Sequence, residues 1–349
     1  MRAVILLCVA ASADACTMYG VGKFASADGT TMVSHSDDGA GNSDSRLSYV
    51  PPADHAKNSK RPVYPSIEEF PKFTGDALGK SYKPKEGMAP TKPIGEIPQV
   101  PHTYGYYVDS YAMQNECGLM FGESTASAVF RADAIGVPNG TALMSIDELS
   151  HIAAERVCTA AEAVQLMGDL AMEHGFYGPD GGAGEMLVVG DPQEVWMFHI
   201  LSDPTAKSAI WIAQRVPDDE VAVAANHFMI REIDLDDSKK FLGGPKEMGG
   251  IAQAHGLWDG KGKLDFTAAF SLGEYGNKYP PPCPRPRKSA WTLSPPLSTL
   301  TQGTTRVVAC GTATGALHPP WFFPPSTSPH SRGAASRSRS RIRSRSSQT

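Results

Sequence analysis

Two helix-start signals in the middle of the chain constrain the fold more than any other feature. Ser145 with Glu148, and Thr159 with Glu162, both form the S/T-x-x-E capping box, and apolar residues at helical spacing follow each. The second helix is expected to stop at Gly175. Because strand-like runs lie in separate blocks before and after these helices, we predict an α+β layered domain rather than a parallel βαβ arrangement.

The predicted strands begin with a hairpin near the N-terminus. Residues 16–22 and 31–36 have strand character, and Asp28-Gly29 between them is a strong hairpin signal. Residues 51–101 are rich in Pro, Lys and Gly, which predicts a long surface excursion rather than core. The other predicted strands are 104–108 and 118–122, on either side of a turn-like stretch at 113–116, and then 186–189, 195–200, 209–213 and 221–225.

The composition changes abruptly after Pro280. Residues 281–349 are rich in Pro, Ser and Arg and hold ten Lys or Arg with no Asp or Glu, which leaves 22 basic and 37 acidic side chains in 1–280. We expect the tail to be disordered, and an acidic body argues against nucleic-acid binding by the folded domain. The alternating Ser-Arg run either contacts RNA or an acidic partner or has no role, and export from the cell favours the second interpretation.

The N-terminus has the pattern of a secretory signal. Arg2, an apolar run at 3–11 and small residues up to Ala15 predict a signal peptide, 1–15, that is cleaved before Cys16. The apolar run is roughly half of the ~20 residues that cross a bilayer, so no membrane anchor is expected. We therefore predict the secretory pathway and an extracellular or lysosome-like compartment. Alternatively, 1–15 form a buried first strand.

The six cysteines lack the spacing of a metal site, and we predict neither a metal nor an organic cofactor. Cys8 leaves with the signal peptide, and Cys283 and Cys310 lie in the tail. Cys117 and Cys158 remain for a disulfide in the body, which the sequence leaves open.

Cys16 has three interpretations: a lipid attachment site, a structural thiol or a nucleophile. A lipid attachment site normally has a larger aliphatic residue where Ala13 stands, and Asp14 is also atypical of such a site. Once exposed, the α-amine of Cys16 has a pKa near ~8 and serves as a general base for the thiol of the same residue. The cleavage site therefore favours the nucleophile.

Several segments, in this order, resemble the dipeptidase A and secernin family of N-terminal-cysteine peptidases, over roughly residues 16–279. The segments are Cys16-Thr17, 21–29, Asp37-Asp38, 115–119, 122–124, 214–219 and 221–226. The resemblance implies an αββα fold of the N-terminal-nucleophile hydrolases, shared with penicillin V acylase and bile salt hydrolase, in a domain spanning 16–280.

The resemblance also implies roles for individual residues. Cys16 would be the nucleophile, Asp38 would hold its α-amine, and Asn115 would donate to the oxyanion. Asn226 would complete the oxyanion hole or orient the amine. Each has a structural alternative: Asp38 caps a turn, Asn115 satisfies the backbone of a turn, and Asn226 ends a strand.

Two departures from the family affect these expectations. The family usually has Arg three residues before the Asp, and this chain has His35, which we expect to contact the substrate and to move activity to low pH. The likeness also fades after Tyr279, whereas family members continue. We therefore expect an incomplete fold, truncated at its C-terminus, that lacks a second active-site Arg.

The leading functional prediction is a cysteine-type dipeptidase acting on small dipeptides. Alternatives are an amidase for N-acylated small molecules and a secreted non-catalytic remnant of the family. Asn139 begins an Asn-Gly-Thr sequon and is a predicted glycosylation site. The sequence leaves the oligomeric state open.

Overall fold

The computed structural model describes residues 16–36, 47–66, 91–178 and 183–272. The predicted signal peptide, Asp38 and the tail at 281–349 lie outside these residues. In the described part, no helix is long and apolar enough to span a membrane.

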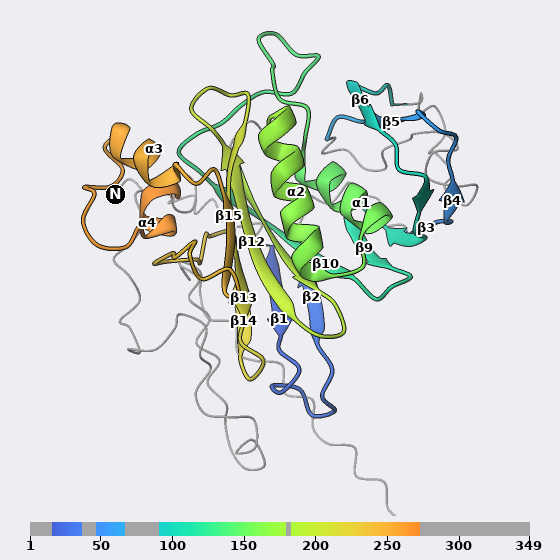
Figure 1. Cartoon of the computed structure of the whole chain (residues 1–349), viewed down its shortest axis with the longest axis horizontal. Helices are drawn as coiled ribbons and strands as arrows, with labels where there is room; N and C mark the ends of the chain where they lie inside the picture. The colour runs from blue at the N-terminus through green and yellow to red at the C-terminus, as the bar shows by residue number, and fades with distance from the viewer. Residues whose placement is uncertain (1–15, 37–46, 67–90, 179–182, 273–349) are drawn as a thin grey trace, which may run out of the picture. The chain divides into compact units, whose positions relative to one another are not determined.

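An antiparallel sheet of eight strands is the largest element of the described chain (Figure 1). Its strand order is β15-β13-β12-β11-β10-β9-β8-β3. The strands are β3 (Ser48–Val50), β8 (Tyr106–Val108), β9 (Ala112–Asn115), β10 (Met120–Ser127), β11 (Ala183–Gly190), β12 (Val195–Ser202), β13 (Ala209–Val216) and β15 (Phe241–Gly244). Every residue of β12 is buried, as expected for a strand covered on both faces.

A smaller sheet contains the predicted N-terminal hairpin. Its order is β14-β1-β2, made of β14 (Val221–Ala224), β1 (Thr17–Val21) and β2 (Met32–Ser36), all antiparallel. At the tip of the hairpin, Gly29 has φ 79°, a conformation that favours glycine. The Asp28 carboxylate accepts a hydrogen bond from the backbone N–H of Thr30 at 3.2 Å. The prediction of two strands joined through Asp28-Gly29 is confirmed.

Both predicted helices form where the capping boxes place them. Ser145 and Thr159 are the N-caps of α1 (Ile146–Arg156) and α2 (Ala160–His174), and α2 ends at Gly175. The side chain of each N-cap accepts from the backbone N–H three residues on, which satisfies an amide that the helix leaves unpaired. The apolar faces of α1 and α2 share a core with Leu187 and Phe198 of the large sheet.

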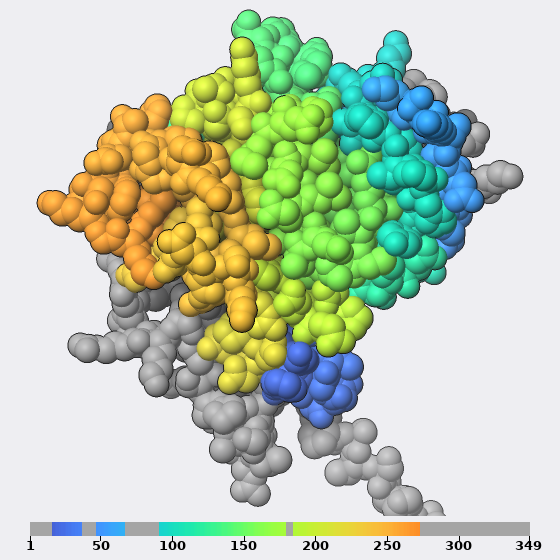
Figure 2. Space-filling model, in the orientation of Figure 1, coloured from blue at the N-terminus to red at the C-terminus, as the bar shows by residue number. Residues whose placement is uncertain are grey.

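The helices and the small sheet lie on opposite faces of the large sheet. Odd-numbered residues of β11, such as Leu187, belong to the helix-side core, and even-numbered ones, such as Val188, share a core with Met18 of β1. In the space-filling view, the green helical residues cover one face between the orange residues at the end of the described chain and the blue-to-cyan residues (Figure 2). A Cβ at Gly20 would lie 2.7 Å from Val188, so this glycine permits the close approach of the two sheets.

The described residues therefore build three layers: helices, the large sheet and the small sheet. The sequence predicted neither β15 nor the two short helices that follow it, α3 (Met248–Ala254) and α4 (Phe266–Phe270). These helices lie beside β15 (Figure 1) and share the core of the small sheet. Mixed α and β layers are confirmed, whereas a second outer helical layer of the kind expected for αββα is not built by the described residues.

The prediction that 51–101 is a surface excursion without core residues is wrong for its described part. It contains β4 (Ala53–Asp54), β5 (Lys60–Val63) and β6 (Gly95–Pro98), and β7 (His102–Thr103) follows it. Val63 and Ile97 are fully buried in the helix-side core. Pro and Lys at nearby positions interrupt the apolar spacing, so the sequence pattern did not identify these two residues as core. The turn predicted at 113–116 is also wrong, since residues 113–115 belong to β9.

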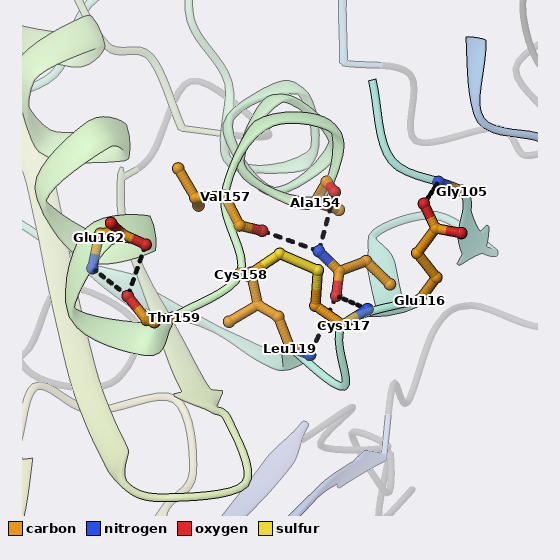
Figure 3. Close-up of a disulfide and its surroundings, with 10 residues drawn as sticks. Gly105, Glu116, Cys117, Leu119, Ala154, Val157, Cys158, Thr159 and Glu162 are labelled. Carbon is orange, nitrogen blue, oxygen red and sulfur yellow. Dashed lines mark hydrogen bonds between the residues drawn. A yellow bond between two sulfur atoms is a disulfide. The ribbon is translucent and has the colours of Figure 1, made fainter. Parts of the chain in front are cut away.

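Cys117 and Cys158 form a disulfide. It joins the turn between β9 and β10 to the loop between α1 and α2 (Figure 3). The pairing that the sequence left open is therefore present, and it links the helical layer to the large sheet.

Candidate active site

Cys16 lies immediately before β1, the central strand of the small sheet. It is half-buried, and among the described residues it forms no disulfide. Met18 pairs with Ala224, the last residue of β14, so Cys16 and Asn226 each lie two residues beyond this pair, at the same end of the two strands. Because side chains alternate along a strand, Cys16 faces the same way as the buried Met18, toward the large sheet.

Ser124 of β10 joins Cys16 to Asn226. Its hydroxyl accepts a hydrogen bond from the backbone N–H of Asn226 at 2.9 Å and donates to the carbonyl oxygen of Cys16 at 3.4 Å. Asn226 has φ 50°, an uncommon left-handed conformation for a residue other than glycine. Its side-chain Nδ2 donates to the carbonyl of Thr125 at 2.8 Å. Within the described chain, its Oδ1 is buried with no hydrogen-bond partner.

His35 lies on the same side of the small sheet. It pairs with Met18 across β1 and β2, and its ring makes an edge contact with Tyr111 at a centroid distance of 6.3 Å. A Cβ at Gly122 would lie 3.3 Å from the Cβ of His35, so His35 packs over β10 two residues from Ser124. The structure thus brings Cys16, His35 and Asn226 to one region between the sheets.

Asn115 is not brought to this region. Its two amide hydrogens are donated to the carbonyls of Ala154 and Val157 at the end of α1, and its Oδ1 accepts from the N–H groups of Cys117 and Leu119. It therefore lies on the helix face of the large sheet. Its backbone N–H bonds the Leu119 carbonyl, five residues from Ser124, which is roughly 17 Å along the chain at ~3.4 Å per residue. With both donors in use, we assign Asn115 to stabilising the turn beside the disulfide.

The remaining predicted residues lie apart from Cys16 or outside the described chain. Asp38 is among the residues that the structure does not describe. Asn139 is exposed in a loop and has φ 65°. Among the described residues, no group of three or more His, Cys, Asp or Glu is arranged to hold a metal ion.

A buried pair of acids, not anticipated from the sequence, lies on the opposite face of β10 from Ser124. Glu123 and Glu185 are fully buried, and the Thr125 hydroxyl donates to Glu123 at 3.0 Å. Burial, with the negative charge of Glu123, raises the pKa of Glu185 well above its usual range. Glu123 and Ser124 both belong to the segment 122–124 of the family resemblance. They differ in their surroundings, because their side chains lie on opposite faces of β10.

A profile described as peptidase family C69 matches residues 15–282. The chain belongs to peptidase family C69. The matched range includes Cys16, Ser124 and Asn226. The predicted resemblance to the dipeptidase A family is confirmed.

Relatives of this C69 chain are named as dipeptidases or probable dipeptidases. It is 29% identical to a probable dipeptidase of Latilactobacillus sakei over 66% of this chain and 43% of the relative. It is 26% identical to dipeptidase A of Lactobacillus helveticus over 65% of this chain and 43% of that protein. A probable dipeptidase of Salmonella dublin is 24% identical over 74% and 53% of the two chains. The C69 chain thus spans about half the length of the curated relatives that it matches.

Proposed function

We propose that this C69 protein is a cysteine-type dipeptidase whose nucleophile is Cys16, exposed as the N-terminal residue by cleavage after Ala15. Membership of the family and the dipeptidase names of its relatives support this activity. The position of Cys16 at the end of a central strand, between two packed sheets, supports its role as the reacting residue.

The observation that carries this proposal is the Oδ1 atom of Asn226. It is buried without a hydrogen-bond partner in the described chain, and the Ser124 hydroxyl bonds the backbone of both Asn226 and Cys16. Buried polar atoms in native proteins are nearly always hydrogen-bonded. An α-amine on Cys16 supplies the missing donor. Through its Oδ1, Asn226 thus orients the amine.

The reaction then follows from the groups of Cys16. The Cys16 Sγ attacks the peptide carbonyl carbon, and its proton passes to the α-amine. The α-amine gives that proton to the leaving amine as the carbon–nitrogen bond breaks, which leaves a thioester on Cys16. Water, deprotonated by the α-amine, hydrolyses the thioester and restores the thiol. Asn226 donates one Nδ2 hydrogen to Thr125, and the second is available to the oxyanion.

The same proposal includes passage through the secretory pathway. The disulfide between Cys117 and Cys158 supports it, because disulfides persist in oxidising compartments. The exposed position of Asn139 makes its sequon accessible to glycosylation. Mass spectrometry of the natively secreted protein should find Cys16 as the first residue, with the disulfide intact. A chain that retains Met1 or begins elsewhere would contradict the proposed nucleophile.

Replacement of the thiol tests the activity directly. Cys16→Ala should abolish hydrolysis of small dipeptides, because no other group supplies the attacking atom, while circular dichroism shows an unchanged fold. Cys310→Ala removes a thiol from the tail and should leave turnover unchanged. Cys16-dependent cleavage of N-acylated amides but not dipeptides would favour the amidase. No Cys16-dependent cleavage of either substrate would favour the non-catalytic alternative.

A further inference from the structure

Ser124 is a fully buried hydroxyl whose hydrogen bonds go to the backbone of the two residues that carry the proposed chemistry. It accepts from the N–H of Asn226 and donates to the carbonyl of Cys16. Neither residue is close to Ser124 in sequence, so these bonds connect three separate segments: the start of β1, the middle of β10 and the end of β14. Both of these hydrogen bonds are to backbone atoms, and neither involves the Cys16 thiol.

Asn226 needs such support because its backbone conformation is unfavourable. A residue with a side chain at φ 50° persists only where its surroundings hold it there. Two neighbouring residues of β10 provide this: the Ser124 hydroxyl binds the backbone of Asn226, and the Thr125 carbonyl binds its side-chain amide. The position of the unpaired Oδ1 therefore depends on both contacts.

We propose that Ser124 is a positioning residue of this site, which holds the Asn226 amide in register with the N-terminal amine of Cys16. It acts through Asn226 and touches neither substrate nor the reacting sulfur. This inference rests on the proposed dipeptidase function, and it adds a residue that links the large sheet to the chemistry of the small one.

The first test compares two buried serines. Ser124→Ala removes the acceptor of the Asn226 N–H and should lower kcat by ~10- to 100-fold, because small misplacements of reacting groups cost this much. KM should change little, since ground-state contacts with the substrate remain. Ser124→Thr, which retains a hydroxyl, should recover most of the lost kcat. Ser150→Ala is the matched control: Ser150 is equally buried and bonds the Ala112 N–H and the Asp147 carbonyl, away from Cys16.

The second test asks whether Ser124 acts through Asn226. Asn226→Gly removes the amide but tolerates the same φ. If Ser124 works by placing that amide, adding Ser124→Ala to Asn226→Gly should lower kcat little further, because the effects of residues that act as a unit are not additive. Fully additive losses, or equal losses in Ser124→Ala and Ser150→Ala, would overturn the proposal and leave Ser124 as an ordinary core residue.

A measurement without substrate separates this inference from the proposed function. Iodoacetamide alkylation of Cys16, followed by peptide mass spectrometry, reports how well the thiol is activated. At pH 7, Ser124→Ala should react more slowly than the wild type and Ser150→Ala. Equal rates in all three would overturn the positioning role. A wild type that cleaves no dipeptide would instead overturn the proposed function, while the alkylation rates still decide the role of Ser124.

Discussion

At the scale of single residues, His199 is the most unusual side chain of the described core. It is fully buried in the centre of β12, its ring stacks on Phe228 at 5.0 Å, and neither ring nitrogen has a hydrogen-bond partner in the described part of the chain. Burial lowers its pKa from 6.5 to about 3, because the charged imidazolium would lose its hydration. The folded protein therefore keeps His199 neutral where an unfolded chain would bind a proton.

His199 should make stability fall with acid. Its folded pKa lies below its unfolded value, so its penalty is absent above pH 6.5 and grows by about 1.4 kcal/mol per pH unit as the pH falls toward 3. His199→Phe keeps the ring stacking but removes the titrating group. It should therefore lower the pH dependence of the unfolding free energy by about 1.4 kcal/mol per pH unit below pH 6.5. Urea unfolding of both proteins between pH 7 and 4 measures it. Parallel stability curves would show that His199 binds its proton equally in both states.

This residue also bears on the proposed compartment. An acidic, lysosome-like compartment near pH 5 would cost about 2 kcal/mol through His199 alone, given about 1.4 kcal/mol per pH unit below its unfolded pKa. That is a substantial part of a typical stability of about 5–15 kcal/mol. The folded protein should therefore be less stable in an acidic compartment than near neutral pH.

At the scale of elements, two helical glycines have opposite surroundings. Gly168 of α2 lies against the large sheet, and a Cβ there would be 2.0 Å from the Trp211 ring of β13. Gly250 of α3 has nothing within 4 Å of the same added atom. The first glycine sets the distance between the helix and the sheet, whereas the second only weakens its helix.

Alanine at these positions should therefore shift stability in opposite directions. Gly168→Ala should destabilise the fold by about 1–3 kcal/mol, because the core must expand around Trp211. Gly250→Ala should stabilise it by about 0.5–1 kcal/mol, the gain in helix propensity. Thermal unfolding of the two variants, each against the wild type, gives the signs. Stabilisation by Gly168→Ala would mean that α2 does not pack on Trp211 as described.

At the scale of the whole molecule, one buried guanidinium ties the 51–101 segment to the helical layer. Arg61 of β5 donates to Glu155 at 2.8 and 3.0 Å and to Glu148 at 2.6 Å. Both acids belong to α1 and are buried with it. Burial alone would lower the pKa of Arg61, but the charges of Glu155 and Glu148 outweigh it and hold the pKa well above its usual range.

Removing this charge should cost more than any single surface contact. Arg61→Met removes the positive charge that the guanidinium supplies to the buried carboxylates of Glu148 and Glu155, and should destabilise the protein by about 3–5 kcal/mol. Arg156→Met, which removes a more exposed guanidinium bonded to the Pro98 carbonyl, should cost less than about 1 kcal/mol. Guanidinium chloride unfolding compares the two variants. Similar losses would show that β5 contributes no buried ion pair in solution.

The sequence predicted helix starts and turns correctly where they depend on residues close together in the chain. The capping boxes at Ser145 and Thr159 and the turn at Asp28-Gly29 all formed, because each depends on hydrogen bonds within a few residues. The strands within 51–101 and β15 were not predicted. They are short, and their buried apolar residues, such as Val63 and Ile97, do not recur at a regular spacing.

The sequence alone determined the family, the helices, most of the large sheet and Cys16 as the candidate nucleophile. It did not distinguish Asn115 from Asn226, since both asparagines occur in family-like segments and both have a local structural alternative. Only the tertiary structure separates their surroundings: Asn115 donates both amide hydrogens to carbonyls at the end of α1, whereas the Ser124 hydroxyl links the backbone of Asn226 to that of Cys16. Pairing between strands about 200 residues apart depends on long-range register and on which face of the sheet each side chain takes, and no local pattern encodes either.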